Sequence, residues 1–266
     1  MASRLRPRTT SELLDALFEL LRHHYLSFLT IVAAGFAPAA ALGAVTGLAG
    51  GFGAFNAFGG SGDPRWTGTL VALLVVFAVV VLASVALVQG AVIYAASDAY
   101  LDDRIDVASA LRRSASNVPM LLIAFLLTGL STLVGYVFLI VPGIYIAAGL
   151  FAVPAIVLLE GRGPSEAMER SMSLTKGRKL AVLGALFVTA LIAGVMRASL
   201  GAVGSIGFGP SVGMAAQIAA YTALYPLTTI MGVLLYYDAR IRFEGFDLER
   251  AAAALDPATP PPTPAA

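Results

Sequence analysis

One apolar run, followed at once by a charged segment, constrains the fold of this chain more than any other feature. Between Leu139 and Leu159 the sequence holds no Asp, Glu, Lys, Arg or His. At the helical rise of about 1.5 Å per residue, this run spans a hydrocarbon core of about 30 Å. Charged residues then crowd into residues 160–179, before apolar sequence resumes at Leu180. The pattern predicts a membrane-spanning helix that ends at a water-facing edge.

The rest of the chain is also rich in hydrophobic residues and poor in charged ones. Of its 266 residues, 58% are hydrophobic and 12% are charged, whereas about 25% are charged in a typical soluble domain. Uncharged windows cover roughly residues 26–48, 68–97, 118–159, 180–196 and 198–237. Windows of this length and number indicate a polytopic membrane protein.

Two of these windows need further division. The window 118–159 is too long for one span, and Val141-Pro142-Gly143 in its middle predicts a break between two helices. The Gly-rich stretch from Gly201 to Gly213 is predicted to be a poor helix, so the last span should begin near Met214. We therefore expect an all-α membrane helix bundle with six transmembrane helices, at about residues 26–48, 69–96, 118–138, 140–159, 180–197 and 214–237. They form one integral membrane domain, residues 1–250, followed by a Pro-rich tail, residues 251–266, that is predicted to be disordered.

The basic residues predict the orientation of the chain. If the N-terminus is cytoplasmic, every Lys and Arg except Arg65 and Arg197 lies on the cytoplasmic side of the predicted spans. Such an excess of Lys and Arg in cytoplasmic loops is the usual determinant of membrane topology. We therefore expect a multi-pass protein of the plasma membrane with both termini in the cytoplasm.

Short cytoplasmic amphipathic helices are predicted before the first, third and fifth spans, at residues 10–24, 100–117 and 163–178. Each has an apolar and a charged face, as expected of a helix that lies in the membrane interface. This order suggests three repeated units, each an amphipathic helix followed by an apolar hairpin. For the first of these helices, the simpler interpretation is that it only leads into the first span. The alternative is that it senses lipid or binds a partner. Candidate contacts to lipid headgroups are the basic residues Arg112, Arg113, Arg170, Lys176, Arg178 and Lys179.

A few polar side chains fall inside the predicted spans. Gln89 is the one strongly polar residue of the second span, and the last span carries Gln217, Tyr221 and Tyr225. Such residues usually hold helices together by hydrogen bonds across a helix interface. The alternative is that they contact a ligand or substrate within the membrane.

The chain offers few groups for catalysis or metal binding. It has no Cys, and His23 and His24 are neighbours on the first amphipathic helix. The predicted spans contain no carboxylate or His that could activate a Ser or Tyr nucleophile. A carboxylate cluster at Asp102, Asp103 and Asp106 is more often solvated or paired with Arg than bound to a divalent cation. We expect no catalytic residue, cofactor, metal site or nucleic-acid partner, and we predict that the protein is not an enzyme.

Two segments carry a resemblance to a known family. They are VPAIVLLEGRGPSEAMERSMSLTKG, Val153 to Gly177, and LLYYDARIRFEGFDLE, Leu234 to Glu249. With the lead-in SELLDALFELLRHH, Ser11 to His24, they resemble the multi-pass membrane domain found with some bacterial glycerophosphoryl diester phosphodiesterases, and the likeness extends over nearly the whole chain. That domain also occurs as a stand-alone protein. In the family the phosphodiesterase activity belongs to a separate soluble barrel, for which we expect these 266 residues to leave no room. The resemblance therefore implies a membrane domain and carries over no catalytic residue.

These expectations leave two functions open. The first is a non-enzymatic membrane protein that organises membrane lipids or a membrane-protein partner through its interfacial helices and basic inner face. The second is a transporter or exporter subunit for a neutral or lipidic substrate. Proton coupling is not expected of it, because the predicted spans leave every Asp, Glu, Lys and Arg outside the hydrocarbon core.

Overall fold

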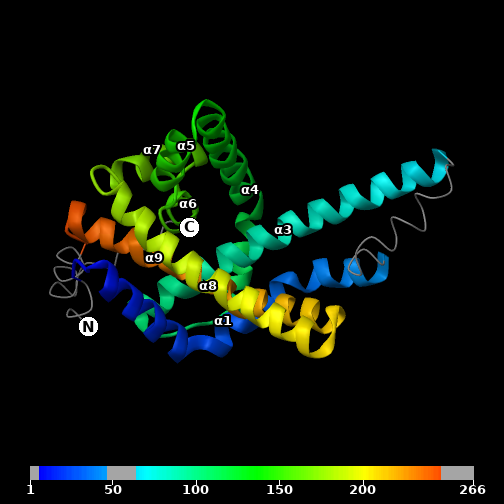
Figure 1. The fold of residues 1–266 in the computed structure, drawn as a ribbon. Helices are drawn as coiled ribbons and strands as arrows, with labels where there is room; N and C mark the ends of the chain where they lie inside the picture. The colour runs from blue at the N-terminus through cyan, green and yellow to red at the C-terminus, as the bar shows by residue number, and fades with distance from the viewer. Residues whose placement is uncertain (1–5, 47–63, 247–266) are drawn as a thin grey trace.

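The computed structural model describes residues 6–46 and 64–246, and within these ranges the chain is built from α-helices without strands. The predicted Pro-rich tail, residues 251–266, lies outside the described residues. In chain order the helices are α1 (Thr10–Thr46), α3 (Pro64–Asp102), α4 (Val107–Phe138), α5 (Ile140–Gly149), α6 (Val153–Leu159), α7 (Pro164–Leu174), α8 (Lys179–Phe208) and α9 (Pro210–Glu244), as Figure 1 shows.

Among the described residues, six segments are long and apolar enough to cross a membrane. They are α1, α3, α4, the α5–α6 pair, α8 and α9. Because each leaves a large share of its apolar side chains exposed, water cannot be the solvent around most of this surface. The prediction of an all-α, multi-pass membrane helix bundle is confirmed.

The prediction that the Gly-rich stretch from Gly201 to Gly213 is a poor helix is wrong. Helix α8 continues through the Gly-rich stretch to Phe208, and only Gly209, at φ 95°, separates it from α9. Here α8 and α9 approach so closely that a Cβ on Gly204 would lie 3.0 Å from the Cα of Gly213. Close packing of helix backbones in the membrane favours glycine and outweighs its poor helix propensity.

The window 118–159 divides where the predicted spans 118–138 and 140–159 place the division, because α4 ends at Phe138 and α5 begins at Ile140. The break is not at Val141-Pro142-Gly143, however, because these residues lie inside α5. The chain turns three residues before Pro142, at Leu139, which is extended at φ −167° and ψ 150°. Pro142 is tolerated because the first turn of a helix does not use its backbone N–H groups. A second interruption between Gly149 and Val153 divides the predicted span 140–159 into α5 and α6.

The amphipathic segments are helical, but only the third stands alone. The first forms the start of α1, which has a kink at His24, where φ is −118° and ψ is 21°. The second contains the last residues of α3 and a non-helical turn at residues 103–106, and from Val107 it forms the start of α4 and runs on into the span. Asp106 caps it by accepting the backbone N–H groups of Ala108 and Ser109 at 3.1 and 3.3 Å. The third is α7, which begins at Pro164.

The helices pack closely at one end of the bundle. Toward the other end α8 and α9 stay in contact with each other, but the α8–α9 pair, the α4–α5 pair and α3 diverge from one another (Figure 1). We call the packed end, where Asp98, Glu160 and Asp238 lie, the inner end, and the opposite end the outer end. Residues 86–100 of α3 are mostly buried, whereas Val75 and Val79 nearer its start are 56% and 59% exposed. In Figure 1 the first half of α3 extends away from the bundle, and the turn between α4 and α5 lies far from this half of α3. This divergence opens the bundle toward the surrounding lipid.

Candidate functional site

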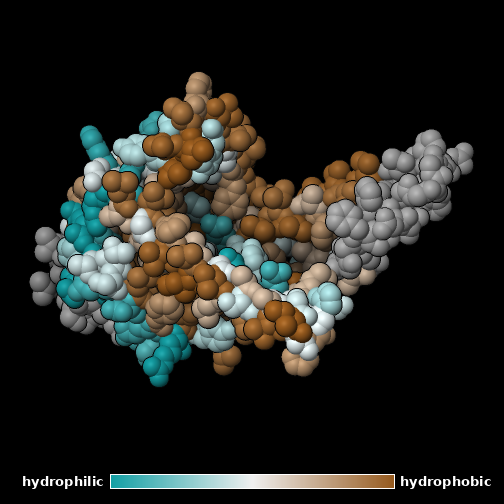
Figure 2. All heavy atoms as spheres, viewed as in Figure 1, coloured by the Kyte–Doolittle hydropathy of each residue, from teal (hydrophilic) through white to brown (hydrophobic). Residues whose placement is uncertain are grey.

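A cavity lies inside the bundle where α3, α6, α8 and α9 meet. Its volume is about 350 Å³, and apolar side chains from all four helices form most of its wall. Its polar lining consists of the side chains of Gln89, Tyr225, Thr228 and Thr229. Figure 2 shows the molecular surface hollowed between largely apolar surfaces, with more hydrophilic residues visible inside.

The position of the cavity along the helices places it within the hydrocarbon core. Gln89 lies nine residues before Asp98 on α3, and Thr229 lies nine residues before Asp238 on α9. At the helical rise, each is about 14 Å from the charged inner end. This is close to half the thickness of a hydrocarbon core of about 30 Å. The cavity therefore presents polar groups near the middle of the membrane.

The polar groups of the cavity are neutral and available. Within residues 6–46 and 64–246, the side chains of Gln89, Thr228 and Thr229 form no hydrogen bond to another residue. No ionised side chain belongs to this described wall. Tyr225 packs its ring edge-on against Phe36 of α1, with the ring centroids 5.6 Å apart. A polar group without a partner in hydrocarbon is costly, so these groups favour a ligand that supplies neutral hydrogen-bonding atoms.

The structure brings together two of the four polar residues predicted from the spans. Gln89 and Tyr225 both line the cavity. Tyr221 lies one turn further toward the outer end, with its ring centroid 5.7 Å from that of Tyr225. Gln217 is exposed outside the cavity and packs against Gly201 of α8.

The predicted set omits four residues of α9 that line the cavity, Thr228, Thr229, Gly232 and Val233. They follow Tyr225 at intervals of three, four, seven and eight residues, which places all of them on one face of the helix. This spacing is visible in the sequence. It identifies a shared face, but it does not reveal which neighbouring helices enclose that face.

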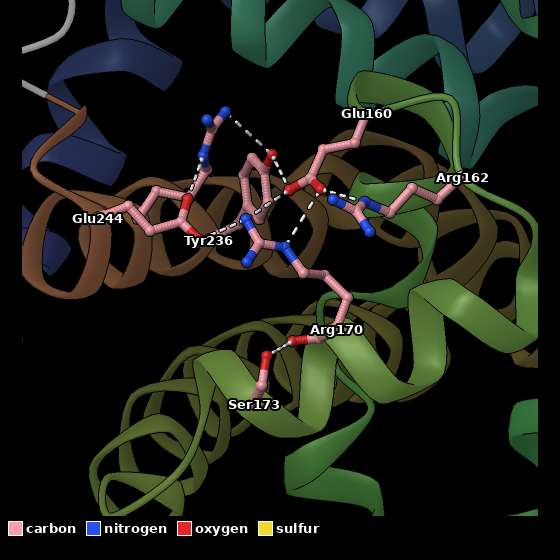
Figure 3. A network of polar contacts seen from close by, with 7 residues as sticks. Glu160, Arg162, Arg170, Ser173, Tyr236 and Glu244 are labelled. Carbon is pink, nitrogen blue, oxygen red and sulfur yellow. Dashed lines mark hydrogen bonds and ion pairs between the residues drawn. The ribbon is translucent and has the colours of Figure 1, made fainter.

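A second polar arrangement closes the inner end of the bundle (Figure 3). Glu160, at the end of α6, accepts hydrogen bonds from Arg162 at 2.9 Å and from Arg170 of α7 at 3.2 Å. It also accepts the hydroxyl of Tyr236 on α9 at 3.0 Å. Arg170 forms a further ion pair with Glu244 of α9. These contacts tie α6 and α7 to the last helix, although their partners are far apart in the sequence.

Arg170 stays ionised within this network. Burial disfavours its charged form, but the hydrogen bonds and negative charges of Glu160 and Glu244 outweigh that cost and raise its pKa above the ordinary value. A guanidinium that is already neutralised by two carboxylates has little remaining attraction for a phosphate. Arg170 therefore serves to join helices.

Asp238 is the centre of another ion-pair group at the inner end. Only 3% of its side chain is exposed. Its carboxylate accepts the backbone N–H of Arg8 at 2.8 Å and the guanidinium groups of Arg178 and Arg242 at 2.8 and 2.9 Å. The group thus joins the segment before α1, the residue before α8, and α9.

The remaining basic residues predicted to contact headgroups differ in their availability. Arg113 pairs with Asp98 and lies over the ring of Tyr94, with Cζ 4.5 Å from the ring centroid. Lys179 places Nζ 3.8 Å from the centroid of the Tyr145 ring. Arg112 and Lys176 are exposed and have no ion-pair partner among the described residues. Headgroup contact stays a prediction, and these last two positions leave their charges available for it.

No cluster of three or more His, Cys, Asp or Glu side chains within the described ranges is arranged to hold a metal ion. His24 instead places Nε2 3.5 Å from Oδ1 of Asp103 at the kink of α1. Comparisons with protein-family models, with curated proteins and with solved structures found no match to this chain.

Proposed function

We propose that this protein is a non-enzymatic membrane protein that binds a lipid in its central cavity and thereby organises lipid in the plasma membrane. One observation carries the proposal: an uncharged cavity at mid-membrane depth combines unpaired polar groups with apolar walls. A volume of about 350 Å³ falls at the lower end of the range typical of small-molecule sites, about 300–1,000 Å³. It suits part of a lipid rather than a whole one.

The chemistry of the cavity matches the part of a lipid where the headgroup joins the acyl chains. Ester carbonyls and glycerol hydroxyls are neutral hydrogen-bonding groups, as are the side chains of Gln89, Thr228 and Thr229. Acyl chains need apolar surroundings, which the lipid-facing surfaces of the helices offer. Leu126 of α4 and Ile218 of α9, for example, are 69% and 59% exposed.

The second candidate is a carrier for a neutral or lipidic substrate, without proton coupling. The lack of ionised residues in the described cavity wall favours an uncoupled over a proton-coupled carrier. A flux assay in proteoliposomes separates the two functions, because a lipid-organising protein retains its ligand while a carrier moves it. The resemblance to the membrane domain found with some bacterial glycerophosphoryl diester phosphodiesterases also supports the proposal that this protein acts on the organisation of lipids.

Filling the cavity tests the proposal. Gly232 lines the cavity and a Cβ added to it meets no atom within 4 Å, so Gly232→Leu starts a bulky side chain at the cavity wall from a position with free space. Leucine also favours the helix by about 0.5–1 kcal/mol relative to glycine. We expect Gly232→Leu to lower the amount of co-purified lipid about fivefold or more while thermal stability stays equal or rises. Native mass spectrometry of the detergent-purified protein measures the retained lipid.

Gly129→Leu is the matched control, because Gly129 of α4 is equally open but does not line the cavity. It should retain lipid like the wild type. Equal retention by Gly232→Leu and the wild type would contradict lipid binding in this cavity.

Orientation is part of the same proposal, with the inner end on the cytoplasmic side. Because the chain has no Cys, single cysteines report on topology without background. We expect Lys176→Cys, beyond α7, to resist a membrane-impermeant maleimide in intact cells and to react after permeabilisation. Gly207→Cys, exposed near the end of α8, should react in intact cells. The reverse labelling pattern would show that the inner end faces the outside of the cell.

A further inference from the structure

Arg197 is the one charged residue between Lys179 and Asp238. It lies within α8, eighteen residues beyond Lys179, and is therefore about 27 Å from the inner end of the helix. That depth is close to the outer edge of a hydrocarbon core of about 30 Å. As a residue, Arg197 is half-buried.

The contacts of Arg197 leave its charge without a counterion. Its Cζ lies 5.4 Å from the centroid of the Tyr221 ring on α9, and no described carboxylate pairs with it. Stacking on an aromatic ring uses the face of the guanidinium and leaves its N–H donors free. An unpaired cation at the edge of the hydrocarbon is costly, so the position favours an anionic partner.

Helix geometry connects Arg197 to the cavity. Leu186 lines the cavity on α8, and Arg197 follows it eleven residues later, which is three turns and returns to nearly the same face. On α9 the ring of Tyr221 stands next to that of Tyr225, whose side chain lines the cavity. A polar path therefore leads from the cavity to a cation at the outer end.

We propose that Arg197 and Tyr221 bind the phosphate of an anionic phospholipid whose ester groups lie against Tyr225 and Thr228. This inference rests on the proposed lipid-binding function and specifies the ligand class and the leaflet. The guanidinium donates to the phosphate oxygens, and the Tyr221 hydroxyl supplies a further donor. From there the acyl chains continue toward the inner end along exposed apolar side chains such as Phe187 of α8, which is 64% exposed.

The test is a competition between two lipids. Purified full-length protein in detergent is incubated with equal amounts of dioleoyl phosphatidylglycerol and dioleoyl phosphatidylcholine, and native mass spectrometry measures the bound ratio. We expect the wild type to favour phosphatidylglycerol about tenfold, and Arg197→Gln to lose that preference while still binding lipid. Arg104→Gln removes an equal charge from the exposed inner surface and should leave the ratio unchanged.

Further variants keep the test decisive if Arg197→Gln folds poorly. Tyr221→Leu keeps the cation but removes its aromatic support, and it should lower the preference severalfold. Arg197→Lys should retain an intermediate preference, because an ammonium is a point charge without the paired donors of a guanidinium. An unchanged ratio in Tyr221→Leu and in any well-folded Arg197 variant would overturn the assignment.

Two outcomes separate this inference from the proposed function. If the wild type binds both lipids equally, the phosphate site is refuted while lipid binding stands. If the wild type binds neither lipid, both fail. Soluble glycerol 3-phosphate at the same concentration should not displace phosphatidylglycerol, because it lacks the acyl chains. Displacement would identify a free phosphate ester as the ligand and overturn the phospholipid assignment.

Discussion

Replacing Asp238 by Ala is expected to destabilise the protein by about 3–5 kcal/mol, the usual cost of removing one partner from a buried ion-pair group. The variant leaves Arg178 and Arg242 close together without their shared carboxylate, and it leaves the backbone N–H of Arg8 without its acceptor. In a chain of this size, that loss corresponds to a fall of roughly 10 °C in the midpoint of thermal unfolding. The fraction of monodisperse protein that remains in detergent after heating measures this midpoint.

Two comparisons make the result specific. Asp238→Asn keeps the shape and one oxygen acceptor of the side chain, so it should fall between Ala and the wild type. Glu169→Ala removes an exposed carboxylate of α7 that has no ion-pair partner among the described residues, and it should change stability by less than about 0.5 kcal/mol. A midpoint for Asp238→Ala equal to that of Glu169→Ala would show that the ion-pair group does not hold the inner end together.

The membrane class was predictable because length and composition restrict it strongly. An uncharged run of about twenty residues has few alternatives to a membrane span, and the bundle contains six such segments as expected. The helix ends were harder to predict, because they depend on packing between helices. Gly201 and Gly204 read as helix breakers in the sequence, yet in the structure they allow α9 to approach α8.

The candidate site was predictable only in part for a similar reason. Gln89 and Tyr225 are conspicuous polar residues within apolar spans, and both line the cavity. Thr228 and Thr229 are less conspicuous, because a threonine in a span can satisfy its hydroxyl on its own helix, as Thr189 does on the carbonyl of Ala185 at 2.8 Å. The sequence also does not reveal that Glu160 reaches Tyr236, which lies 76 residues further along the chain.

The two ion-pair groups at the inner end and the residues of the cavity have different roles in this fold. Half of the predicted headgroup contacts, namely Arg113, Arg170 and Arg178, are neutralised by carboxylates within the protein. They hold the inner halves of the helices together, while the outer halves diverge into lipid. A rigid inner end with an open outer end gives a lipid lateral access to a cavity whose walls stay in place.

Replacing Ser171 of α7 is the second change expected to have a large effect on stability, because Ser171 bridges the interruption between α5 and α6 by hydrogen bonds. Its hydroxyl donates to the carbonyl of Gly149 at 2.7 Å and accepts the backbone N–H of Ala152 at 3.3 Å, and the side chain is fully buried. Both backbone groups lie where the helix is broken, so neither has a helical partner. Ser171→Ala leaves the two groups unpaired, which should cost about 2–4 kcal/mol.

The effect of Ser171→Ala should also be local and should reach the cavity. Residues 150–156 carry Phe151, Pro154 and Ala155 into the cavity wall, so amide hydrogen exchange in this segment should accelerate and lipid retention should fall. Ser173→Ala is the matched control on the same helix, because the exposed Ser173 hydroxyl bonds only to the carbonyl of Arg170 within α7. Equal exchange rates in the two variants would show that the interruption is held by packing alone, since only Ser171 bridges it by hydrogen bonds.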